Sequence, residues 1–187
     1  MYQGNYSAVA RKPEELLFPV LRKLGMSFYA YSPLAGGFLT KSRQQIEHGV
    51  GRWDPQSAIG KTYHSMYRKP AMLEALARWE SIANEEGCTR ADLAYRWVRY
   101  NSPLKSEFGD ALIIGASNLN QLEETLASIG KGSLSEKAAE QISEIWDLIE
   151  SEARQDGSRR TTRYGPSSPP PSPPVPFLSM RNMNTGD

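Results

Sequence analysis

The chain of 187 residues carries 22 lysine and arginine residues against 21 aspartate and glutamate residues, a formal net charge of +1. This near balance argues against a nucleic-acid partner, because such proteins carry a basic patch or stripe. The single cysteine, Cys88, excludes an intrachain disulfide and favours a reducing compartment. No apolar run is long enough to cross a membrane, and the N-terminus lacks the features of a signal peptide. The sequence therefore predicts a soluble cytoplasmic protein with no membrane partner.

Composition changes sharply near residue 158. Residues 158–187 hold seven of the 13 prolines and too few apolar side chains to build a core. We predict that this segment is a disordered Pro/Ser-rich tail. The alternative is a polyproline II ligand for an SH3- or WW-type domain. Residues 1–157 are the part predicted to fold.

Within residues 1–157 the pattern alternates between strands and helices. Predicted strands cover residues 2–5, 27–31 and 111–114, and predicted helices cover residues 14–24 and 71–86 and follow the capping residues Thr89, Asn118 and Ser135. Residues 34–70, with five glycines, are expected to form a long irregular excursion. Short apolar strands separated by helices are typical of a parallel sheet covered by helices.

The stretch from Ala111 to Leu126 is the most informative local pattern. An apolar run ends at Gly115, Asn118 then stands three residues before Gln121, and leucines recur at helical spacing. A parallel strand that turns into a capped helix presents free backbone N–H groups, which suit an anion such as a phosphate. An ordinary strand-to-helix turn with a well-made cap explains the same residues.

Three separated motifs occur in order along residues 1 to about 152. They are Tyr2-Gln-Gly-Asn-Tyr6, Phe28-Tyr-Ala-Tyr-Ser-Pro-Leu-Ala-Gly-Gly-Phe-Leu-Thr40 and Gly115-Ala-Ser-Asn-Leu-Asn-Gln-Leu-Glu-Glu124. Together they resemble the aldo-keto reductase superfamily, in the branch of the aflatoxin-aldehyde reductases and aryl-alcohol dehydrogenases. The resemblance implies a TIM barrel that holds NADP(H) across the C-terminal ends of its strands.

On this alignment the chain runs from the sixth strand of the barrel to its end. A complete barrel takes about 250 residues. The implied fold class is therefore α/β, an incomplete C-terminal half of a (β/α)8 TIM barrel. The family's catalytic Asp, Tyr, Lys and His lie in the other half, and no stretch of this sequence matches their motifs, so no catalytic residue is assigned.

The resemblance implies which residues of this chain bind the nicotinamide end of the cofactor. Gln3 aligns with the glutamine that hydrogen-bonds the nicotinamide carboxamide, and an amide suits this role because it both donates and accepts. Tyr31 aligns with the aromatic residue that stacks on the nicotinamide ring; the alternative is that it packs in the core. Ser32, Leu34 and Gly36 align with the loop that approaches the pyrophosphate.

The resemblance also implies that the adenosine end of the cofactor binds at the start of the last barrel helix. Ser117, Asn118, Gln121 and Glu124 align with the positions that hold the adenosine phosphate and the adenine. For Gln121 the alternative is a purely structural role as capping partner of Asn118. Thr125 stands where many relatives have an asparagine that binds adenine.

Two further departures concern the phosphate sites. Gln121 replaces an arginine that pairs with the 2′-phosphate in many relatives, and no basic residue lies between Gly115 and Leu126. This weakens the case for NADPH over NADH, although a hydroxyl donor can also serve a phosphate. The segment Leu39-Thr40-Lys41 lacks the glycine that relatives place before the lysine.

The remaining chemistry-bearing residues point to no second site. His48 and His64 have no cysteine or acidic neighbour at ligand spacing, so we interpret both as solvated loop residues and propose no metal site. Cys88 is predicted to pack rather than to react. Arg52 and Trp53 either reach a bound cofactor or staple the loop.

By resemblance, the function is NADP(H)-dependent reduction of an aldehyde or ketone to an alcohol, with a small-molecule carbonyl compound as substrate. The alternative is a non-catalytic protein that binds the cofactor and acts through protein contacts. Three parallel strands leave unpaired edges. A homodimer through these exposed strand edges is a possible assembly.

Overall fold

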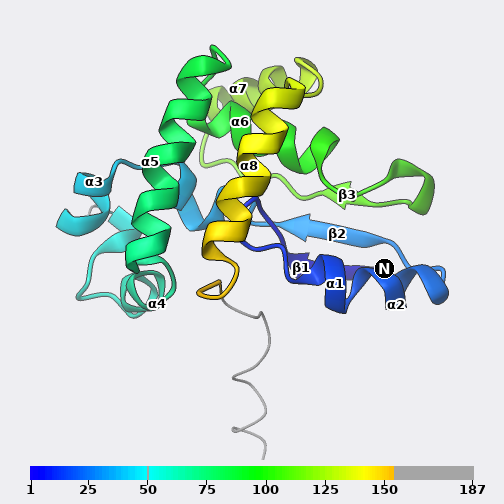
Figure 1. The fold of residues 1–187 in the computed structure, drawn as a ribbon, viewed down its shortest axis with the longest axis horizontal. Helices are drawn as coiled ribbons and strands as arrows, with labels where there is room; N and C mark the ends of the chain where they lie inside the picture. Colours follow the sequence, from blue (N-terminus) through cyan, green and yellow to red (C-terminus); the bar gives the residue numbers. More distant parts are fainter. Residues whose placement is uncertain (50, 154–187) are drawn as a thin grey trace, which may run out of the picture. The chain divides into compact units, whose positions relative to one another are not determined.

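A computed structural model describes residues 1–49 and 51–153, so the predicted tail at 158–187 lies outside the described residues. Three short parallel strands form a sheet in the order β1-β2-β3: β1 is Tyr2–Asn5, β2 is Phe28–Tyr31 and β3 is Ala111–Leu112 (Figure 1). The strand predicted at 111–114 is shorter than expected, although the N–H of Ile113 still donates to the carbonyl of Ala30 at 2.8 Å. The structure is thus α/β with a parallel sheet, as predicted.

The two faces of the sheet differ in what covers them. Gly4, Phe28 and Ala30 lie on one face and are buried. A Cβ atom on Gly4 would lie 2.5 Å from the Phe28 ring, so this ring requires glycine beneath it. Gln3 and Tyr31 lie on the opposite face and are exposed, because side chains alternate along a strand. Parallel sheets are normally covered on both faces. Among the described residues, the second face of this sheet is left partly exposed, and we refer to it below as the uncovered face.

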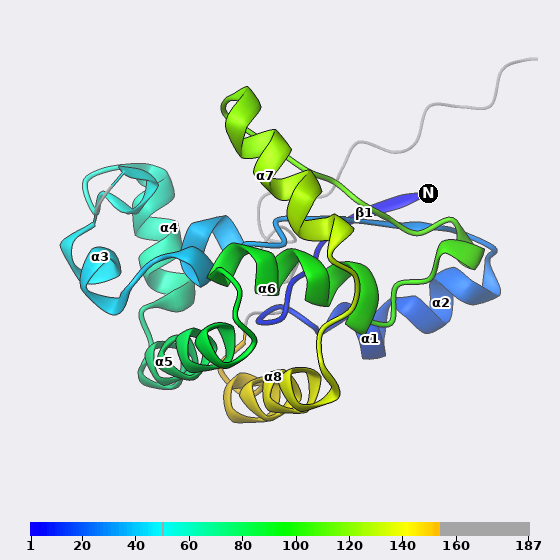
Figure 2. The same cartoon turned by 90° about the horizontal axis from the view of Figure 1, so that it is seen from above.

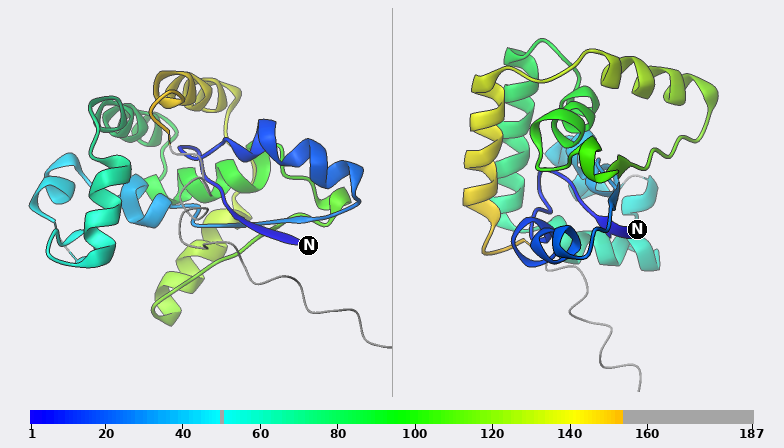
Figure 3. Two further views of the ribbon diagram at one scale, coloured as in Figure 1. Left: turned by 90° about the horizontal axis from the view of Figure 1, so that it is seen from below. Right: turned by 90° about the vertical axis from the view of Figure 1, so that its right-hand side faces the viewer.

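The described residues form eight α-helices in addition to the sheet. They are α1 Pro13–Leu16, α2 Phe18–Lys23, α3 Arg43–His48, α4 Ala58–Tyr67, α5 Pro70–Glu85, α6 Arg90–Arg96, α7 Leu119–Gly130 and α8 Glu136–Ile149. Helices α5 and α8 lie side by side in Figure 1, and α6 lies between this pair and α7 (Figures 2 and 3). The predicted inner faces of the helix that follows Thr89, which is α6 continued by a π-helical turn at Trp97–Asn101, and of α8 are confirmed, since the following residues are buried: Leu93, Ala94, Trp97, Val98, Ala138, Ile142, Ile145 and Ile149.

The helix predicted over 14–24 is two short helices. The break falls at Leu17, whose φ of −117° departs from helical geometry, and Pro19 then occupies the first turn of α2. Proline is tolerated in a first turn because the N–H that it lacks has no partner there. The proline therefore lies at the start of the second helix, α2.

The prediction of an irregular excursion over 34–70 is wrong. A 3₁₀ helix at Ala35–Thr40 is followed by α3, a 3₁₀ turn at Gly51–Trp53 and α4. Ser42 caps α3 and Ser57 caps α4 through their side-chain oxygens. Trp53 lies beneath these elements with no exposed surface and holds them together. Short capped helices around one buried ring need no long apolar periodicity, and the sequence pattern therefore failed to reveal them.

Helix α7 begins and ends close to the predicted positions, but its apolar side chains do not form the buried face. Leu119 is 66% exposed and Leu126 is 53% exposed. Thr125 and Ser128 are buried instead. In the described part of the chain, Leu119 and Leu126 are therefore not packed into the core.

Candidate functional site

Strands β1 and β2 place Gln3 and Tyr31 on the same face of the sheet, and Tyr31 is the last residue of β2, at the carboxyl end of the strand. Gln3 lies opposite Tyr29 in the sheet register, and Asn5 lies opposite Tyr31. All four side chains lie on the uncovered face, and Tyr31 is 40% exposed. The core-packing alternative for Tyr31 is therefore wrong. Ligands of parallel α/β sheets bind at this end of the strands.

A pocket of about 220 Å³ opens beside Tyr31. Helix α4 forms one wall, and the loop after β2 forms another. The lining residues are Asn5, Tyr31, Ser32, Gly36, Tyr63, Met66 and Tyr67. The volume lies below the 300–1,000 Å³ of typical small-molecule pockets, so it fits part of a larger ligand.

The loop after β2 has an unusual backbone. Ser32 (φ 58°) and Ala35 (φ 52°) adopt the left-handed region although neither is glycine, and Gly36 (φ 66°) and Gly37 (φ 91°) follow. Such strain persists where the surrounding structure enforces it, and it is common at ligand sites. A Cβ atom on Gly36 would lie 2.6 Å from the Tyr63 ring, so close approach also requires glycine there.

Of the three loop residues that the sequence predicted, the structure places two at the pocket. Ser32 and Gly36 line it, whereas the half-buried side chain of Leu34 packs against the core. The carbonyl of Leu34 accepts from the N–H of Gly37 at 3.0 Å and so helps to form the turn.

The second predicted group lies at the start of α7. The side chain of Asn118 accepts a hydrogen bond from the N–H of Gln121 at 3.0 Å, which confirms the predicted cap. The side-chain oxygen of Gln121 accepts from the N–H of Ser117 at 3.0 Å rather than from Asn118. Gln121 therefore has a structural role. Its side chain binds the backbone N–H of Ser117, one residue before the N–H of Asn118 that a capping box would use. Ser117, Asn118, Gln121 and Glu124 are all exposed.

These side chains use two of the backbone donors at the start of α7. The first-turn N–H groups of Leu119 and Asn120 are the natural candidates for an external anion, since the first N–H groups of a helix have no partner within it. Thr125 is buried against the interior, so it is not available to a ligand.

Four pocket residues were missed by sequence reasoning. Asn5 lies within the first motif and was not assigned a role, and Tyr63, Met66 and Tyr67 lie on α4, in the region expected to be irregular. The signals that point to α4 are the Ser57 cap and the four-residue spacing between Tyr63 and Tyr67.

Trp53 fixes the loop after β2 by contacts of its side chain, which is the second of the two roles considered for it. Its indole N–H donates to the carbonyl of Gly36 at 3.3 Å, and its ring lies 5.3 Å from the ring of Tyr63 between centroids. The interpretation of His64 as solvated is wrong: the residue is half-buried, and its Nε2 lies 2.8 Å from the carbonyl oxygen of Trp53. His48 is exposed, as expected, but it lies on α3 rather than in a loop.

Cys88 is half-buried and packs against the core, as predicted. Burial raises the pKa of its thiol, which disfavours the reactive thiolate. Within residues 1–49 and 51–153, no group of three or more His, Cys, Asp or Glu side chains is arranged to hold a metal ion. None of the helices in those ranges is long and apolar enough to span a bilayer.

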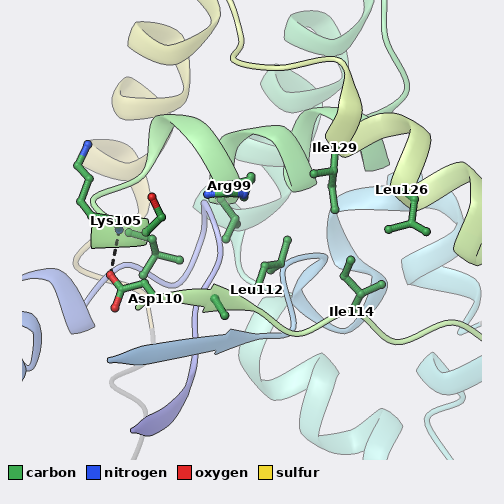
Figure 4. A pocket seen from close by; sticks show the side chains of 11 residues that line it. Arg99, Lys105, Asp110, Leu112, Ile114, Leu126 and Ile129 are labelled. Atoms are coloured by element: carbon green, nitrogen blue, oxygen red, sulfur yellow. Dashed lines mark hydrogen bonds between the residues drawn. The ribbon is translucent and has the colours of Figure 1, made fainter. Parts of the chain in front are cut away.

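A second cavity, of about 300 Å³, lies between α7 and β3 (Figure 4). Leu126 and Ile129 of α7 point toward Leu112 and Ile114 across it. Asp110 at its edge is already occupied, since its carboxylate accepts hydrogen bonds from Arg22 and from two backbone N–H groups. The cavity is largely apolar and shares no residue with the predicted cofactor positions.

Comparison with known proteins identifies the chain's relatives. The model of the "Aldo/keto reductase family" matches residues 1–147. The oxidoreductase sirO of Leptosphaeria maculans is 40% identical over 153 residues, which are 82% of this chain and 46% of that protein. Aflatoxin B1 aldehyde reductase member 2 of Homo sapiens is 38% identical over 159 residues, covering 80% of this chain and 44% of that protein.

A solved structure shares the fold. The glycerol dehydrogenase AKR11B4 from Gluconobacter oxydans matches with a TM-score of 0.50 and 19% identity, over 77% of this chain and 41% of that chain. The chain spans about half the length of the curated relatives that it matches. The family match over residues 1–147 and the order of the three motifs agree, and the chain belongs to the aldo/keto reductase family.

Proposed function

We propose that this chain provides the nicotinamide-nucleotide side of an NADP(H)-dependent reductase that converts an aldehyde or ketone into an alcohol. The observation that carries the proposal is the placement of Gln3 and Tyr31 on the same exposed sheet face, with Tyr31 at the carboxyl end of its strand, where ligands of such sheets bind. Family membership supports the reaction class.

We further propose that the three strands are consecutive strands of a (β/α)8 barrel. Their parallel order and the likeness to the glycerol dehydrogenase support this. In a barrel, the face that carries Gln3 and Tyr31 would be enclosed by the remaining strands. Strands β1 and β3 are the two edges of the described sheet, and a homodimer through these edges remains a prediction.

The residues present fit a nicotinamide nucleotide. The Gln3 amide would bind the carboxamide, and the Tyr31 ring would cover one face of the nicotinamide. The strained turn that contains Ser32 and Gly36 would admit the pyrophosphate close to the backbone. The start of α7 would hold the adenosine phosphate through Ser117 and the first-turn N–H groups. When bound, the cofactor supplies the hydride that reduces the carbonyl carbon.

A second candidate function is cofactor binding without catalysis. It is favoured by one observation, that no stretch of the sequence matches the family's catalytic Asp, Tyr, Lys and His motifs. The two functions separate in an assay that follows NADPH oxidation with an aromatic aldehyde. Binding without turnover by this chain supports the second function, and turnover that depends on Tyr31 supports the first.

Replacing Tyr31 with alanine should weaken NADPH binding about fivefold, because stacking of aromatic rings contributes about 1 kcal/mol. Tyr2→Ala is the matched control: Tyr2 is 43% exposed in the paired strand but stacks on Phe28 on the opposite face. Titration of NADPH fluorescence measures both dissociation constants. Equal affinity in wild type and Tyr31→Ala, or equal losses in the two variants, would contradict the proposed site.

A further inference from the structure

Helix α7 is held mainly by polar contacts. Its leucines at 119 and 126 are largely exposed, and the cavity of about 300 Å³ separates part of its apolar side from β3 (Figure 4). The residues that α7 buries are Thr125 and Ser128. Apolar packing therefore contributes less to fixing α7 than it does for α8, whose isoleucines are fully buried.

The main polar contact centres on Asp92 of α6. The hydroxyl of Ser128 donates to one carboxylate oxygen of Asp92, and the ammonium group of Lys131 donates to the other at 2.5 Å. Asp92 and Ser128 are both buried, whereas Lys131 remains half-exposed. Charge-assisted hydrogen bonds of this kind are roughly twice as strong as neutral ones.

Burial alone raises the pKa of the Asp92 carboxyl, but the hydrogen bonds with Lys131, Ser128 and Thr89 and the charge of Lys131 together outweigh it, so the pKa lies below its ordinary value. The group is therefore a carboxylate at neutral pH. Ser128 lies in the last turn of α7 and Lys131 directly follows the helix, so these two donors connect the end of α7 to Asp92.

One turn further along α6, Arg96 holds the chain that leaves α7. Its guanidinium donates to the carbonyl oxygens of Gly132 and Ser133 at 2.9 Å and 2.7 Å, and it also pairs with Glu86. Asp92 and Arg96 lie on one face of α6, because residues four apart are neighbours on a helix. Tyr100 adds a third contact, since its hydroxyl donates to the carbonyl of Ile129 at 2.8 Å. The C-terminal end of α7 is therefore anchored by polar contacts, and its N-terminal end lies about 18 Å away, given 1.5 Å per residue over 12 residues.

We propose that Asp92 is a positioning residue for the anion site at the start of α7, acting through Ser128 and Lys131; this rests on the proposed cofactor site. A rigid helix transmits a change of tilt from one end to the other. A tilt of about 10° at the anchored end would move the first-turn N–H groups by about 3 Å, given the helix rise. That displacement equals the length of a hydrogen bond, so it would break contacts to a bound phosphate.

The test compares Asp92→Asn and Ser128→Ala with the control Glu85→Gln, which removes the exposed pair between Glu85 and Lys137. Without ligand, hydrogen exchange of the amides of residues 119–130 should quicken in the first two variants and stay unchanged in the control. With ligand, the affinity for 2′,5′-ADP should fall about two- to fivefold, the range that a helix terminus contributes. The affinity for nicotinamide mononucleotide, which carries only the other half of the cofactor, should be unchanged.

A general loss of folding would lower both affinities together and would overturn a positioning role. Unchanged 2′,5′-ADP affinity in Asp92→Asn, with binding retained by the wild type, would overturn it as well. Failure of the wild type itself to bind 2′,5′-ADP is a different result: it removes the proposed cofactor site and the role of Asp92 with it.

Discussion

Replacing Asp110 with alanine should lower the free energy of unfolding by about 3–5 kcal/mol, the usual cost of removing one partner from a buried ion pair. The Asp110 side chain has no exposed surface and bridges three segments. Its carboxylate pairs with Arg22 of α2 at 2.5 Å and accepts from the backbone N–H groups of Phe28 and Lys105 at 2.8 Å and 2.9 Å. The substitution would leave a guanidinium and two backbone donors without these bonds.

Urea unfolding followed by circular dichroism measures this effect. Asp110→Asn is the control, because an amide oxygen still accepts hydrogen bonds but carries no charge for Arg22. We expect its loss to lie between wild type and Asp110→Ala. Equal stability of Asp110→Ala and wild type would show that the carboxylate does not join β2, β3 and α2.

Replacing Trp53 with alanine should cost about 3–5 kcal/mol, as is typical when a large buried aromatic residue is removed. The ring has no exposed surface and lies within 6.1 Å, between centroids, of the rings of Phe38, Tyr63, His64 and Tyr67. Since Trp53 also binds the carbonyl of Gly36, the substitution should loosen the pocket beside Tyr31.

Hydrogen exchange over residues 35–67, together with urea unfolding, measures this second effect. Trp53→Phe keeps an aromatic ring and loses the hydrogen bond to Gly36, so we expect a smaller loss, mainly about 1 kcal/mol for that bond and the smaller ring. If exchange quickens equally over α5 and α8 and not preferentially over 35–67, the view that Trp53 locally organises this region is wrong.

The elements that the sequence predicted well are those with a strong local signal. The strand Phe28–Tyr31 is rich in aromatic residues and the helix that follows Ser135 has a clear apolar pattern, and the Asn118 cap is visible in the spacing to Gln121. Alternation along the strands also places Gln3 and Tyr31 on one face. These features depend on neighbours in sequence, so pattern alone reveals them.

Other features depend on contacts between distant segments. Helix α4 contributes Tyr63 and Met66 to the pocket because Trp53 and the loop after β2 hold it there, and no periodic pattern encodes that contact. The leucines of α7 follow a helical spacing, yet the interior contact is made by Ser128 with Asp92, 36 residues earlier in the chain. The sequence around a short polar residue such as Ser128 does not reveal which distant residue it hydrogen-bonds.

The most direct test of the proposed cofactor site is a titration of the ¹⁵N-labelled chain with 2′,5′-ADP, followed by the backbone amide shifts. The strand, the glycine turn and the capped start of α7 lie together in the described residues, so they need no further segment to present their N–H groups. We expect the amides of residues 117–121 to shift first and binding to be weak, since an exposed helix terminus contributes only about 0.3–1 kcal/mol per charge. If these amides stay still while those of Gln3 or Tyr31 respond, the adenosine phosphate does not bind at the start of α7 and the proposed placement of the cofactor is wrong.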